Sequence, residues 1–147
     1  MTILAFALGN PLRGDDGAGP AIAAGLATLV PGLEVIEAAA LLPEHADEVA
    51  AADGVLFLDA AADGPPGEVL SAPVLPRAAR AALLHALLPE ELLGLARALH
   101  GRAPPAALVT IAGADFSCRE ALSPEVAAAV PLARTHALEA ARAFVAP

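Results

Sequence analysis

Short apolar runs alternate along this chain with segments of helical spacing. Residues 2–8 (TILAFAL) and 54–60 (GVLFLDA) are almost entirely apolar, which is typical of strands that are buried on both faces. Residues 33–38 (LEVIEA) alternate between apolar and polar positions, as a half-buried strand does. Further strands are predicted at residues 67–74, which follow the turn DGPPG, and at residues 106–114.

Helix-start signals mark the segments between these strands. Residues 89–101 begin with Pro, carry acids in the first turn and basic groups later, and end at Gly. Residues 123–145 begin with a Ser that can act as N-cap, then Pro and Glu, and we expect Pro131 to kink or interrupt this helix. Shorter helices are predicted at residues 20–30 and 43–52.

This alternation predicts an α/β fold, a three-layer α/β/α sandwich with a largely parallel sheet of about five strands. No repeat, linker or low-complexity tail divides the sequence, so residues 1–147 are expected to form a single domain. In open sheets of this kind, ligands bind beyond the carboxyl ends of the strands. Polar residues that directly follow a predicted strand are therefore the first candidates for a functional site.

The chain is 57% hydrophobic, largely because of alanine and leucine, but it has no apolar run long enough to span a bilayer. We therefore expect no membrane association. The opening segment MTILAFALGNP lacks a basic start and a small-residue cleavage site, so it does not resemble a signal peptide. A cytoplasmic location is expected.

The formal charge of −9 argues against nonspecific nucleic-acid binding, which requires a basic face, and the absence of Trp and Tyr removes most base-stacking platforms. Cys118 is the single cysteine, which excludes an internal disulfide and any CxxC motif. We expect it to be a small packed residue. The sequence leaves a monomer and a weak homo-oligomer open, since alanine-rich helices offer a surface for packing.

Two adjacent acids, Asp15 and Asp16, lie in a glycine-rich loop directly after the first predicted strand. A helix cap explains one of them, but neighbouring carboxylates repel each other unless a cation or a hydrogen-bond donor lies between them. A phosphate-binding loop is an alternative, because such loops cradle anions with backbone N–H groups. However, the loop matches neither GxGxxG nor a P-loop, and its two acids would repel a phosphate. We therefore favour cation binding.

Asp59 ends the third predicted strand, where an unpaired carboxylate cannot point into the core, so we expect it in the crevice beside the first strand. His85 lies in the apolar stretch AALLHALLPEE and is either a core histidine or a third ligand. Two carboxylates and one imidazole suit zinc or nickel. Asp63 is expected to be a turn residue. The other histidines lie in helical segments and have structural explanations: His45, His100 and His136.

Other catalytic patterns are missing from the sequence. It contains neither HExxH nor GxSxG, and its serines and its cysteine have no recognisable base near them. The sequence therefore identifies no covalent nucleophile.

Three blocks in order resemble one family over nearly the whole chain. ILAFALGNPLRGDDGAGPAIA resembles the N-terminal signature of the nickel–iron hydrogenase maturation peptidases, an apolar strand followed by Gly-Asn-x-Leu, an acidic pair and a helix-opening Gly. VLFLDAAADGPPGEV resembles their second block, a strand that ends in Asp-Ala. LHALLPEELLGLARALHGRAPPAALVTIAGADFS resembles their third, a His followed by a Leu-rich helix and a strand.

The resemblance implies a three-layer α/β/α fold and an endopeptidase that removes the C-terminal extension of a nickel-loaded hydrogenase large-subunit precursor. It implies Asp16, Asp59 and His85 as the metal-binding and catalytic residues, with nickel supplied by the substrate and zinc or cadmium as surrogates. Asp15 would then cap a helix or hold a ligand in place, and Asn10 would shape the loop.

One segment departs from the family pattern. Many members have a glycine-rich stretch after the second strand, whereas this chain reads IEAAALLPEHADEV, so substrate contacts around residues 37–44 stay open. Two alternative functions also stay open. One is a non-proteolytic nickel- or zinc-binding module that uses the same three residues, and the other is a flavodoxin-like nucleotide binder that uses the loop at residues 9–19.

Overall fold

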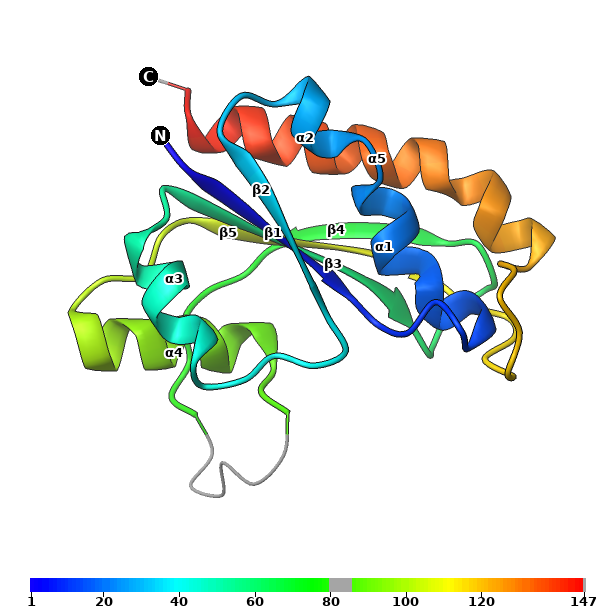
Figure 1. Cartoon of the computed structure of the whole chain (residues 1–147), viewed down its shortest axis with the longest axis horizontal. Coiled ribbons are helices and arrows are strands. Elements are labelled where there is room, and N and C mark those ends of the chain that lie inside the picture. Colours follow the sequence, from blue (N-terminus) through cyan, green and yellow to red (C-terminus); the bar gives the residue numbers. More distant parts are fainter. Residues whose placement is uncertain (80–85, 147) are drawn as a thin grey trace.

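The computed structural model describes residues 1–79 and 86–146 (Figure 1). Its described strands form one five-stranded sheet in the order β2-β1-β3-β5-β4. The strands are β1 (Ile3–Leu8), β2 (Leu33–Ala38), β3 (Gly54–Ala61), β4 (Val69–Pro73) and β5 (Ala106–Ala112). The helices are α1 (Ala18–Ala23), α2 (Leu26–Leu29), α3 (His45–Ala51), α4 (Pro89–His100) and α5 (Pro124–Phe144), and a 3-10 turn, η1 (Gly14–Gly17), precedes α1.

Four of the strands run parallel to one another, and β4 pairs antiparallel with β5 at one edge. In Figure 1, α1, α2 and α5 cover one face of the sheet, and α3 and α4 cover the other. The predicted three-layer α/β/α sandwich with a largely parallel sheet is therefore confirmed. The chain leaves β1 for β2 on one side and returns to β3 on the other side. The carboxyl ends of β1 and β3 thus flank the point where the strand order reverses, which is where ligands bind in such sheets.

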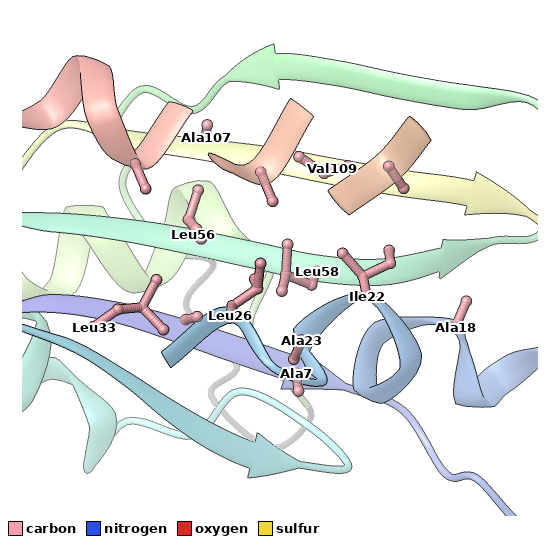
Figure 2. Packing of buried hydrophobic residues seen from close by; sticks show 14 of the residues in the cluster. Ala7, Ala18, Ile22, Ala23, Leu26, Leu33, Leu56, Leu58, Ala107 and Val109 are labelled. Carbon is pink, nitrogen blue, oxygen red and sulfur yellow. The ribbon is translucent and has the colours of Figure 1, made fainter. Parts of the chain in front are cut away.

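Each central strand contributes side chains to two separate cores, because successive residues of a strand face opposite sides of the sheet. In β3, Leu56 and Leu58 pack under α1, α2 and α5, whereas Val55 and Phe57 pack under α3 and α4. Figure 2 shows Leu56, Leu58 and Ile22 in this first cluster, with Ile22 nearer to Leu58 than to Leu56. Burial on both faces explains why the sequence of β3 is a continuous apolar run rather than an alternating one.

Small residues bring the helices close to the sheet. The buried positions of α5 on the core side include Ala133, Ala137 and Ala141, all fully buried. In α1, a Cβ at Gly19 would overlap the backbone carbonyls of Leu8 and Leu58. The start of α1 therefore lies directly against the ends of β1 and β3.

Two helix predictions differ from the structure. The helix predicted at residues 20–30 is divided into α1 and α2, because Gly25 adopts a left-handed conformation with φ of +80° between them. In contrast, α5 continues through Pro131 without interruption. The buried alanine face of α5 compensates for the backbone hydrogen bond that a proline cannot donate.

Among the helices that the structure describes, none combines the length and the apolar character needed to cross a membrane.

Candidate functional site

A cleft of about 230 Å³ opens at the carboxyl ends of β1 and β3. Asp16 and Asp59 line it together, so the structure brings these two predicted site residues to one place. Their approach follows from the register, because Ala7 pairs with Leu58 and β1 therefore ends beside Asp59. The other lining residues come from the loops after β1 and β2 and from the segment that enters α4: Leu8, Gly9, Ala39, Ala40, Leu41, Ala86, Leu87, Leu88 and Pro89.

The turn that carries Asp16 is shaped by the motif before it. Gly9 has a φ of +117°, which favours glycine, and a Cβ there would overlap the backbone carbonyl of Asp16. Asn10 N–H donates a hydrogen bond of 2.8 Å to Asp16 Oδ2, and Leu12 N–H donates one of 3.0 Å to Asn10 Oδ1. The expectation that Asn10 shapes the loop is confirmed. These bonds leave Asp16 half-buried and lining the cleft.

Asp59 is a carboxylate in an unfavourable setting for its charge. It lies in β3, half-buried, and its Oδ1 accepts a hydrogen bond of 2.8 Å from Ala60 N–H. Burial raises the pKa of Asp59 to about 6, against the lowering effect of that hydrogen bond, and the negative charge of Asp16 adds to the rise. A cation between the two carboxylates would remove this penalty, so the cleft suits a positively charged ligand.

Asp15 lies elsewhere, although it is the neighbour of Asp16 in the chain. It is fully buried, and its carboxylate accepts hydrogen bonds from the backbone of Ala114 and Asp115 and from Ser123. No described side chain caps η1 or α1, so the first of the two roles expected for Asp15, capping this helix, is wrong, and the second, holding a ligand in place, stays a prediction. Burial raises the pKa of Asp15, but the hydrogen bonds outweigh it and hold the pKa below its usual range.

His85, the predicted third ligand, lies outside the described residues. In the described part of the chain, no three His, Cys, Asp or Glu side chains gather to hold a metal ion. The next residue, Ala86, lines the cleft. The described structure therefore brings two carboxylates together, and all three metal ligands stay a prediction.

The other three histidines have structural partners, as expected. His45 Nδ1 accepts a hydrogen bond from Leu42 N–H, and its ring packs edge-on against Phe6 with centroids 5.3 Å apart. His100 Nε2 lies 2.7 Å from Asp47 Oδ1, and His136 lies 4.0 Å from a carboxylate oxygen of Glu139. None of these three lines the cleft.

Cys118 is exposed rather than packed, so that expectation is wrong. The residue lies in an exposed part of the loop between β5 and α5, and it belongs to neither of the two cores. Asp63 is exposed in the bend after β3, in agreement with its predicted role as a turn residue.

Several cleft residues carried no sequence signal for function. The segment after β2, where the family's glycine-rich stretch is missing, contributes Ala39, Ala40 and Leu41 to the cleft. Leu41 is joined to the segment before α4, since Leu87 N–H donates to Leu41 carbonyl at 3.1 Å. The sequence predicted that a helix begins at Pro89, but it did not indicate that Leu88 and Pro89 line a cleft. The departure from the glycine pattern thus falls in a segment that lines the site.

Comparison of the sequence with family models finds no match, and comparison with curated proteins finds none either. The structure, by contrast, is similar to several solved structures. The hydrogenase maturating endopeptidase HybD from E. coli superposes with a TM-score of 0.75 at 24% identity, over 99% of this chain and 94% of that chain. At this identity the likeness shows the fold.

Two archaeal structures are slightly closer in sequence. A nickel–iron hydrogenase maturation protease, HybD from Thermococcus kodakarensis, has a TM-score of 0.70 and 25% identity over 96% of this chain and 99% of that one. A hydrogenase 2 maturation peptidase from a Thaumarchaeota archaeon has a TM-score of 0.70 and 26% identity over 95% of this chain and 97% of that one. The likeness thus extends over nearly the full length of both chains in each pair.

Proposed function

Because the chain belongs to the family of hydrogenase maturation peptidases, we propose that it removes the C-terminal extension of a hydrogenase large-subunit precursor that already holds nickel. Membership supports the general activity, that of a peptidase in hydrogenase maturation. The finer proposal is that the cleft recognises the nickel of the precursor through Asp16, Asp59 and His85. The metal is then part of the substrate.

One observation carries this proposal: Asp16, from the turn after β1, and Asp59, from the neighbouring parallel strand β3, share one cleft, and burial together with the charge of Asp16 raises the pKa of Asp59. Without a cation, the repulsion between the two negative charges is not offset. A divalent cation would offset it, because two carboxylates suit such an ion as ligands. The same feature speaks against a nucleotide binder, because a phosphate in this cleft would meet two negative charges.

The residues fit a borderline metal ion such as nickel or zinc, which accepts carboxylate and imidazole ligands. His85 would supply the imidazole, and the place of its neighbour Ala86 on the cleft supports this assignment. The bound metal would orient the precursor's tail and polarise the peptide carbonyl or a water molecule.

The chain's own residues have two tasks in this scheme. Asp59 has to lose its proton before it can bind a metal, and its raised pKa means that binding releases a proton at pH values near 6. The apolar wall at Ala39–Leu41 and Leu87–Leu88 excludes water and contacts the peptide that enters the cleft. A dry cleft strengthens the attraction between the metal and the two carboxylates.

The test is the intact mass of a candidate large-subunit precursor after incubation with the protein, with and without nickel loading. We expect one C-terminal peptide to be lost from the nickel-loaded precursor and no change in the nickel-free one. The Asp16→Asn variant serves as the control for contaminating proteases, because it should leave the precursor intact. An unchanged mass with a correctly paired, demonstrably loaded precursor would overturn the proposal and favour a non-proteolytic metal-binding module.

A further inference from the structure

The two adjacent acids of the motif point in different directions. Asp15 is 0% exposed, whereas Asp16 is half-buried and lines the cleft. The turn η1 explains the divergence, because consecutive side chains of a 3-10 helix project about 120° apart. One acid therefore faces the interior and the other faces the ligand site.

The interior acid is held by a cradle of donors from the far end of the sequence. Asp15 Oδ2 accepts hydrogen bonds from Ala114 N–H at 2.7 Å, Asp115 N–H at 2.9 Å and Ser123 Oγ–H at 2.8 Å. Asp15 Oδ1 accepts a fourth from Ser123 N–H at 2.7 Å. Hydrogen bonds to a charged carboxylate are stronger than neutral ones, so this is a firm attachment.

Backbone contacts join the same two segments. Asp15 N–H donates to the carbonyl of Asp115 at 2.8 Å, and Gly14 N–H donates to that of Arg119 at 2.7 Å. A Cβ at Gly14 would overlap the Asp115 carbonyl, and one at Gly113 would lie 3.1 Å from Asp15 Cβ. The loop between β5 and α5 thus packs directly against the turn η1.

The turn η1 has little support of its own. It spans four residues, and no described side chain caps it. A single turn of this kind is unstable in isolation, because the cost of ordering it is not repaid by its own hydrogen bonds. Its orientation must therefore come from tertiary contacts, and these include the four hydrogen bonds to the carboxylate of Asp15.

We propose that Asp15 is a positioning residue for Asp16: by anchoring η1 to the segment at residues 114–123, it holds the Asp16 carboxylate opposite Asp59 in the cleft. The inference rests on the proposed function, because Asp15 would position Asp16 for metal binding. When a residue that holds a metal ligand in place is substituted, the metal affinity of the site typically falls by about 10–100-fold.

The Asp15→Asn variant tests this inference, because it keeps the shape but turns an NH₂ group toward N–H or O–H donors. Asp115→Asn is the matched control, the same change in a carboxylate of the same loop that bonds Ser117 and Arg119. Isothermal titration with Ni²⁺ and with Cd²⁺, well below the unfolding temperature, should show at least about 10-fold weaker binding for Asp15→Asn. The control should bind within about 2-fold of the wild type.

A second readout does not depend on metal. The amide proton of Asn10 donates to Asp16 Oδ2, so its NMR resonance reports whether that carboxylate is in place. We expect it to move in Asp15→Asn toward its position in Asp16→Asn. If Asp15→Asn fails to fold, Ser123→Ala, which removes one of the four donors, should give a smaller shift in the same direction.

A folded Asp15→Asn protein with wild-type metal affinity and an unmoved Asn10 resonance would overturn the inference and leave Asp15 a purely structural residue. If the wild type binds no metal and processes no precursor, the proposed function fails. In that case the Asn10 resonance alone decides whether Asp15 positions Asp16.

Discussion

Asp15 and Asp59 are both withdrawn from solvent, but the chain surrounds their carboxylates in opposite ways. Asp15 receives four hydrogen bonds from described residues, and its pKa is held below its usual range against the effect of burial. Among the described residues, Asp59 receives one, from its neighbour Ala60, and burial, together with the charge of Asp16, raises its pKa to about 6. A carboxylate whose pKa is lowered on folding stabilises the fold in its charged form, whereas one whose pKa is raised keeps its charge at a cost to stability, as carboxylates at functional sites often do.

The largest expected effect is on activity and falls on the cleft acids. Asp16→Asn and Asp59→Asn should each lower precursor processing to below about one-thousandth of the wild-type rate, because an amide is a poor ligand for the metal. Time courses followed by intact mass measure this, and circular dichroism confirms that each variant is folded. Unimpaired cleavage by either variant would remove that residue from the mechanism.

The next effect is on stability and falls on Asp15. At pH 7, Asp15→Asn should lower the free energy of unfolding by about 3 kcal/mol, because it leaves buried donors without their charged acceptor. Since the folded-state pKa is lowered, this contribution is present above the unfolded pKa near 3.8 and is lost as the pH falls through the folded value.

Guanidinium unfolding of both proteins at a series of pH values measures this difference. The gap between wild type and Asp15→Asn should narrow as the solution is acidified. A gap that stayed constant into the acid range would show that the charge of Asp15 has no part in the stability.

Asp59→Asn should raise the free energy of unfolding, which is the opposite of the effect expected for Asp15→Asn. Because the pKa of Asp59 rises from 3.8 to about 6 on folding, its charged form destabilises the protein fully above pH 6 and not below the unfolded value. The variant should therefore gain about 3 kcal/mol in free energy of unfolding above pH 6 and nothing at acid pH. The same unfolding series decides the point, and a loss of stability at neutral pH would contradict the account of Asp59.

The smallest effect sharpens the assignment of Asp15. Ser123→Ala removes one hydroxyl donor to Asp15 and the N-cap of α5, in which Val126 N–H donates to Ser123 Oγ at 3.4 Å. It should cost about 1 kcal/mol at pH 7 and leave most of the processing activity, because three donors stay in place. A loss of stability as large as that of Asp15→Asn would mean that the hydroxyl, not the cradle as a whole, holds the turn.

The sequence was sufficient for the parts of this picture that depend on local pattern. Apolar runs predicted β1 and β3, and a carboxylate directly after such a run predicted that Asp59 would lie in the crevice. The motif also identified Asp16 as a cleft residue. These features follow from the rule that an unpaired charge cannot enter the core.

Sequence could not predict what depends on residues far along the chain. The donors to Asp15 lie 99 to 108 positions away, so the pattern around residues 15 and 16 could not distinguish a helix cap from a buried anchor. Similarly, Pro131 does not interrupt α5, because the buried alanine face that supports the helix is set by tertiary packing. That Asp15 is buried while Asp16 lines the cleft could therefore be learned only from the structure.

Anomalous diffraction from crystals soaked in nickel or cadmium at about pH 8, where Asp59 is ionised, would show whether Asp16 and Asp59 bind a metal ion. We expect one metal peak in the cleft, within coordination distance of carboxylate oxygens of Asp16 and Asp59, and none beside Asp15. A peak at Asp15, or a cleft that stays empty while metal binds elsewhere on the chain, would contradict this expectation.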